Sequence, residues 1–143
     1  MAVDTYKNYP HNVLEASYTP KDAEGIVEGM MVKLDANDEL VKADGTAGEY
    51  AMLAMNGMPK GFMDNSGKIQ CIKENGSFLT DQFKVGPSYT PHVRLQVSTA
   101  GGEEGLITIH GGGASPVIGR FIGWNKNSAN DDVTFMTFDL VRD

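Results

Sequence analysis

The sequence predicts an all-β fold: a small β-barrel or β-sandwich, β-tulip or jelly-roll-like, with an extended N-terminal arm. Three observations support this prediction. The 143 residues include 17 glycines and six prolines, which favours short strands over long helices. The apolar segments between these residues are short, and several alternate at period two. Residues 1–25 lack that pattern, so we assign them to the arm and residues 26–143 to a single β domain.

The arm is polar and is interrupted by Pro10 and Pro20. Residues before proline are pushed to extended conformations, and we expect one short strand at residues 12–17. A solvated tail usually avoids aromatic residues, yet this segment carries Tyr6, Tyr9 and Tyr18. The tyrosines indicate that the arm docks on a surface, either that of its own domain or that of a partner.

The first half of the domain begins with a predicted hairpin. Residues 31–34 and 40–43 are its strands, and the Asp/Asn-rich segment 35–39 is its turn. A second turn at 44–48 leads to a strand at 49–55, which is almost wholly apolar and therefore expected to be buried on both faces. Around two Asn-Gly or Asn-Ser-Gly turns we expect further short strands, at residues 61–63, 67–72 and 77–79.

The second half follows the same pattern. Strands are predicted at residues 92–97, 106–109, 116–124 and 133–140, separated by glycine-rich turns at 98–105 and 110–115. One helical turn is predicted, at residues 80–83.

The two halves resemble each other in their order of short apolar segments. Val32-x-Leu34, Leu40-Val41 and Ala51-Met52-Leu53 match Val93-x-Leu95, Leu106-Ile107 and Pro116-Val117-Ile118. This similarity is explained either by an internal duplication or by the ordinary spacing of a β-meander. Both explanations predict an all-β sandwich or barrel.

Composition narrows the classes of function. The net charge of −7 argues against binding to nucleic acid or to an anionic membrane surface, because both require a basic face. A single cysteine, Cys71, excludes an internal disulfide and a cysteine-based zinc site. No apolar run reaches the ~20 residues that span a bilayer, and the N-terminus has no signal-peptide pattern. We therefore expect synthesis in a cytoplasm.

The candidate catalytic motifs are incomplete. His110-Gly111-Gly112-Gly113 is similar to the oxyanion loop of esterases, but the Gly-x-Ser-x-Gly nucleophile motif is missing, so a flexible turn is the better interpretation. Cys71 has no neighbouring base and is expected to be a small buried residue. The histidines show no metal-binding spacing: His11, His92 and His110.

The acidic turn 35–39 could supply oxygen ligands, but Leu40 stands where a calcium-binding EF-hand loop requires glycine. Neither glycine-rich phosphate-binding motif occurs. We therefore expect no catalytic residues, no cofactor and no metal, and we predict that the protein is not an enzyme.

Two segments carry a resemblance to a known family. The first comprises Glu28–Asp35, Glu39–Thr46 and Ala51–Ala54. The second comprises Phe78–Phe83, Tyr89, Pro91, Val93–Val97, Gly105–Thr108 and Pro116–Arg120. Their order and spacing resemble the head-decoration (cement) proteins of tailed phages, including the lambda type. Pro91-His92 stands where that pattern has a glycine.

The resemblance implies a structural role on a virion. Such proteins bind the outer capsid surface after the head expands and stabilise the shell, usually as trimers and sometimes as dimers. In the trimeric kind, the N-terminal arm becomes ordered on the shell and pairs with strands of the major capsid protein. Strand addition of this kind gains its affinity from main-chain hydrogen bonds. The arm residues implied for capsid binding are Tyr6, Tyr9, Val13, Leu14 and Tyr18.

Contacts between subunits are expected at the glycine-rich loops, through Gly101, Gly102, Gly111, Gly112 and Gly113. Aromatic residues near the C-terminus are interpreted either as core or as contact residues: Phe121, Trp124, Phe135 and Phe138. Two other classes of function stay open. One is another phage structural part, such as a head–tail connector, tail-tube or fibre-base subunit. The other is a small β-barrel enzyme or ligand-binding protein.

Overall fold

The computed structural model describes residues 3–5, 14–21, 25–57, 67–127 and 130–142. Over these ranges the chain is all-β and contains no helix. The strands are β1 (Val3–Thr5), β2 (Leu14–Tyr18), β3 (Met31–Leu34), β4 (Leu40–Lys42), β5 (Met52–Ala54), β6 (Ile69–Glu74), β7 (Ser77–Thr80), β8 (Arg94–Val97), β9 (Ile107–Ile109), β10 (Gly119–Asn127) and β11 (Asn130–Asp139). The predicted all-β class is confirmed.

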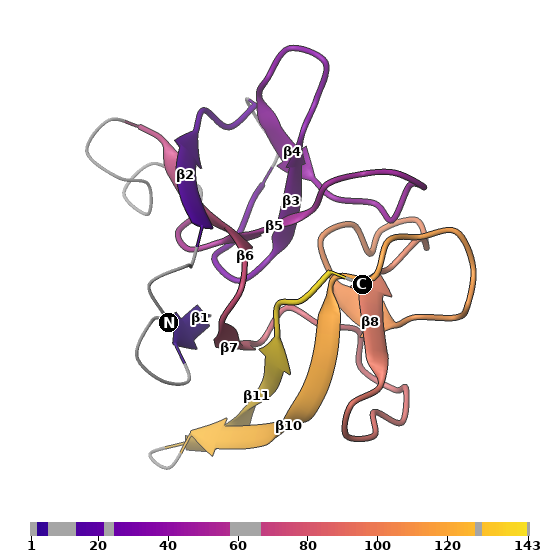
Figure 1. Ribbon diagram of the computed structural model, residues 1–143. Helices are drawn as coiled ribbons and strands as arrows, with labels where there is room; N and C mark the ends of the chain where they lie inside the picture. Colours follow the sequence, from indigo (N-terminus) through magenta and orange to yellow (C-terminus); the bar gives the residue numbers. More distant parts are fainter. Residues whose placement is uncertain (1–2, 6–13, 22–24, 58–66, 128–129, 143) are drawn as a thin grey trace.

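The strands form two antiparallel sheets. One has six strands in the order β1-β7-β11-β10-β8-β9, and the other has five in the order β2-β6-β5-β3-β4. Neither sheet closes into a barrel, so of the two predicted architectures the sandwich is the compatible one. In Figure 1 the five-stranded sheet, drawn mainly in purple, lies above the orange and yellow strands of the six-stranded sheet.

Most predicted strands are present. The hairpin formed by β3 and β4 is confirmed, and all three residues of β5 are buried. The helical turn predicted at 80–83 is wrong, because the main chain there is engaged by β9: Ile107 N donates to Gln82 O at 3.2 Å. The predicted strand at 116–124 begins later, at Gly119, and the strand predicted at 61–63 lies outside the described residues.

The two sheets share one topology. Strands β2 to β6 are arranged β2-β6-β5-β3-β4, and strands β7 to β11 are arranged β7-β11-β10-β8-β9. In each set the second and third strands form a hairpin, β3–β4 or β8–β9. The next strand, β5 or β10, pairs with the first strand of that hairpin. β1 is the one described strand outside this repeated unit. The order of strands therefore favours the internal duplication over a simple meander.

Hydrogen bonds outside the strand ladders repeat as well. Lys21 N donates to Leu40 O at 3.0 Å, and Lys84 N donates to Ile107 O at 2.8 Å. Around the start of β3, Gly29 N donates to Ala54 O and Ala54 N to Met30 O. Around the start of β8, His92 N donates to Phe121 O and Phe121 N to Val93 O.

These bonds define equivalent positions. From Pro20 to the β3–β4 turn, residues correspond to residues 63 positions later (Pro20 to Phe83), and residues after the turn correspond to residues 67 positions later (Leu40 to Ile107). Val32 is therefore equivalent to Leu95, whereas the sequence comparison aligned it with Val93. The displacement is two residues, and strands present the same face every second residue, so the sequence pattern alone could not detect it.

Two clusters of buried residues form the core. The larger one lies between the sheets and includes Leu53, Phe78, Leu95 and Phe138. The smaller one lies within the five-stranded unit and includes Ile26, Val32, Met52 and Cys71. Tyr18 and Leu34 pack against the smaller cluster and are only partly buried, which leaves that unit with an accessible mouth.

Candidate functional site

The predicted arm residues are separated by the structure. Tyr6, Tyr9 and Val13 lie outside the described residues. Leu14 and Tyr18 are the first and last residues of β2, which pairs with β6 from Leu14↔Glu74 to Tyr18↔Ile69. β2 therefore belongs to the five-stranded sheet, although the sequence analysis assigned residues up to 25 to the arm. A short strand was predicted at residues 12–17, but within the arm, because its partner β6 is distant in sequence.

The glycines of the two predicted contact loops are exposed. A Cβ built on Gly101, Gly102, Gly111, Gly112 or Gly113 would meet no atom within 4 Å. Segments 98–100 and 111–115 line one shallow cleft of about 410 Å³, so the structure brings the two loop regions together. The second loop is organised by His110, whose Nε2 donates to Ser115 O at 2.8 Å and whose Nδ1 accepts from Gly112 N at 3.1 Å.

The turn that follows β4 inserts into the second half of the molecule. Gly45 has φ +79°, and a Cβ there would lie 2.7 Å from both Val97 O and Thr99 Cγ2. Ser115 Oγ donates to Gly45 O at 2.7 Å. Only glycine suits this position, because its backbone is left-handed and it is in close contact with neighbouring atoms.

An ion-pair network stabilises this turn. Lys33 Nζ lies 2.8 Å from Asp44 Oδ1 and 3.3 Å from Glu49 Oε1. Glu49 Oε2 accepts a hydrogen bond from Gly45 N at 2.7 Å, so this main-chain donor of the turn has a partner. The Lys33 ammonium, together with the hydroxyl of Thr46, holds the pKa of Asp44 well below its usual range.

A cavity opens at the mouth of the five-stranded unit. It has a volume of about 720 Å³, within the range typical of ligand sites. Its walls combine apolar, aromatic and charged groups: Tyr18, Lys33, Leu34, Asp35, Ala36, Thr46, Ala47, Gly48, Glu49, Tyr50, Met52 and Lys73. The sequence analysis did not find this cavity, because its residues come from β2, β3, β5, β6 and two turns.

Two cations lie over the tyrosine rings of this cavity. Lys73 Nζ is 5.7 Å from the ring centroid of Tyr18, and Arg142 Cζ is 4.0 Å from that of Tyr50. Arg142 also donates to Ala51 O and Lys73 O, which attaches the C-terminal segment to β6 and to the residue before β5. Cation–π attraction of this kind favours these positions of the two cations over the rings.

The aromatic residues near the C-terminus divide between core and surface. Phe121 and Phe138 are buried, whereas Trp124 is 47% exposed and Phe135 is half-buried. Trp124 packs against Phe83, Tyr89 and Phe121 with ring centroids 5.1–5.5 Å apart.

Other chemistry-bearing groups do not converge. The described residues hold no cluster of three or more His, Cys, Asp or Glu side chains suited to a metal ion. Cys71 is buried, and burial raises the pKa of its thiol to about 12. His92 and His110 lie in separate turns, and His11 lies outside the described residues.

Comparisons with protein-family models, curated proteins and solved structures found no match for this chain. Within the described part of the chain, no helix is long and apolar enough to cross a membrane.

Proposed function

We propose that this protein is a structural, non-enzymatic virion component that binds the outer surface of a phage capsid and cements the expanded shell. The resemblance of residues 28–54 and 78–120 to head-decoration proteins supports the proposal. The major capsid protein is the expected partner, and the N-terminal segment is the expected contact.

The proposed strand exchange rests on the position of β1. β1 lies at the edge of the six-stranded sheet, outside the repeated unit, and pairs with β7 through three residues only. So short a pairing can be exchanged for a strand of another protein at little cost. Ordering further arm residues costs about 1–2 kcal/mol each, which burial of the tyrosines and of Val13 would offset.

The test uses particles that lack the protein. Heads are incubated with the full chain, with a chain lacking residues 1–13, and with a chain in which those residues are replaced by a Gly/Ser linker of equal length. Because β2 begins at Leu14, both variants are expected to fold, and circular dichroism verifies this. A deletion to residue 17 would remove most of β2 and is unsuitable.

We expect the full chain to bind in a simple ratio to the coat protein, measured by quantitative mass spectrometry, and both variants to lose binding. Full occupancy by the variants would refute the role of the arm. Absence of binding by the full chain would refute the shell-binding role itself.

A further inference from the structure

The contact between the two halves of the chain suggests how separate copies associate. In that contact, the Gly45 turn of the first half reaches Val97, Thr99 and Ser115 of the second half. Next to it, Met31 N donates to Gly105 O at 3.0 Å and Gly105 N to Ala43 O at 2.8 Å.

We call the surface that Val97, Thr99 and Ser115 present to the Gly45 turn the receptor. The repeat places an equivalent receptor on the first half. The counterparts of Val97, Thr99 and Ser115 are Leu34, Ala36 and Gly48, and all three line the 720 Å³ cavity. In the second half the Gly45 turn contacts Val97, Thr99 and Ser115, and the last two also line the 410 Å³ cleft beside that contact. In the first half the same positions surround an open cavity.

The second half carries the matching turn. The counterpart of Gly45 is Gly112, and both have the left-handed backbone, with φ of +79° and +84°. The turn from Gly111 to Gly113 is exposed, with nothing within 4 Å of a Cβ built on any of its residues. Within the described residues, the Gly111–Gly113 turn is therefore free to dock, and the cavity lined by Leu34, Ala36 and Gly48 is open to receive it.

We propose that copies of this protein associate head to tail, with the Gly111–Gly113 turn of one copy inserted into the Leu34–Ala36–Gly48 cavity of the next. The contact repeats between copies the junction that exists within each chain. This inference does not depend on shell binding, because it concerns only contacts between copies.

Charge agrees with this arrangement. The counterparts of Met31 and Gly105 are Arg94 and Asp38, which are both exposed. The contact therefore brings the Arg94 guanidinium of one copy next to the acidic turn that carries Asp38 in the next. Met31 and Gly105 are buried at the junction within the chain, whereas Arg94 and Asp38 are exposed and fit the polar rim of a contact between copies.

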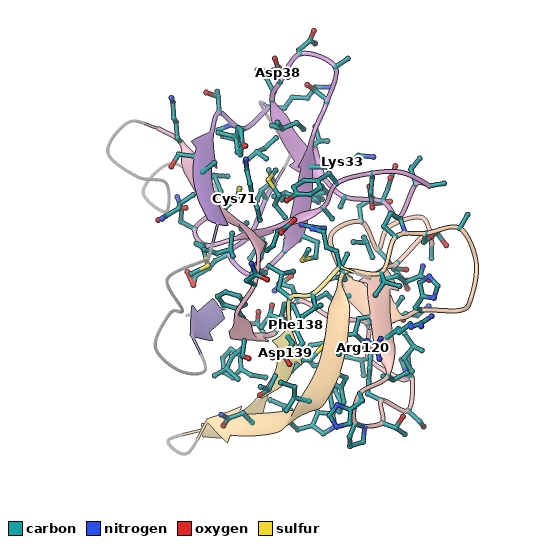
Figure 2. The ribbon with its side chains drawn as sticks, in the orientation of Figure 1. Lys33, Asp38, Cys71, Arg120, Phe138 and Asp139 are labelled. Carbon is teal, nitrogen blue, oxygen red and sulfur yellow. The ribbon has the colours of Figure 1, made fainter. Side chains whose placement is uncertain are left out.

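The two contact surfaces lie on different halves of the molecule. Figure 2 shows Asp38 at the outer end of the five-stranded unit and Arg120, cross-strand neighbour of Arg94, on the six-stranded sheet. A contact between two different surfaces is heterologous, and it yields a closed ring when its rotation closes.

The first experiment blocks the turn. Sedimentation velocity of the full chain, from micromolar to millimolar concentration, is expected to show association. Gly113→Trp is expected to abolish it without loss of folding, since the position has open space. Val85→Trp is the control, because Val85 is 84% exposed and lies outside the docking turn and outside both predicted contact loops. A monomer at every concentration, or equal behaviour of the two variants, would overturn the proposal.

The second experiment reverses the charges. Arg94→Glu and Asp38→Lys are each expected to weaken association at least tenfold, and the double variant is expected to recover most of the loss. A mixture of the two single variants should recover association, because both contacts between unlike chains pair opposite charges, whereas either variant alone pairs like charges. Independent, additive losses with no recovery would refute the pairing of these residues.

Discussion

Gly119→Ala is expected to disrupt the centre of the six-stranded sheet. Gly119 is the first residue of β10 and pairs with Leu95 of β8. A Cβ at this position would lie well inside contact distance of the Asp139 carbonyl oxygen and 3.3 Å from the Phe138 ring. The carbonyl belongs to the main chain and cannot rotate away, so the strands must separate.

The size of the destabilisation follows from the contacts that are lost when β10 is displaced. Displacing β10 weakens about two ladder hydrogen bonds, at about 1 kcal/mol each, and overpacking adds about 1–3 kcal/mol. We expect the free energy of unfolding to fall by about 3–4 kcal/mol, which lowers Tm by about 10 °C in a chain of this size.

Thermal and urea unfolding measure the effect. Gly123→Ala is the matched control in the same strand, because a Cβ there meets nothing within 4 Å. The control should be neutral or slightly stabilising, since alanine reduces the entropy of the unfolded chain. A Gly119→Ala protein as stable as the control would show that β10 does not lie against Asp139 as described.

Three further predictions concern single residues. His92 occupies, at φ +69°, the position of Gly29 (φ +93°) in the repeat, so His92→Gly should stabilise the fold by about 0.5–1 kcal/mol in urea titrations, and no gain would show that the left-handed backbone at His92 is not strained. The lowered pKa of Asp44 contributes stability above about pH 4, the unfolded value, and this contribution is lost as pH falls through the folded value; Asp44→Asn should flatten the acid decline of Tm, and an unchanged decline would exclude the Lys33 ion pair as its source. Cys71 should resist a thiol reagent at pH 8 until the protein is unfolded in urea, and rapid labelling of the native protein would contradict its burial.

The mouth of the five-stranded unit shows why part of the site escaped prediction. Lys33, Tyr50 and Lys73 each lie in or beside a predicted strand, and each is ordinary in its local context. They share a cavity only because β3, β5 and β6 are adjacent in one sheet. The glycine-rich loops, by contrast, could be recognised directly, because glycine marks main chain that bends sharply or must stay accessible.

The sequence alone determined the all-β class, the β3–β4 hairpin, the burial of β5 and the similarity of the two halves. These follow from local rules, since alternation at period two and Asn, Asp and Gly turns act within a few residues. Only the tertiary structure decided the register of the repeat, the inclusion of β2 in a sheet, and which half keeps an open receptor. Those properties depend on pairing between distant segments. β2 needs β6, and within the described residues the Leu34–Ala36–Gly48 positions line an open cavity, whereas Gly45 contacts their counterparts in the second half.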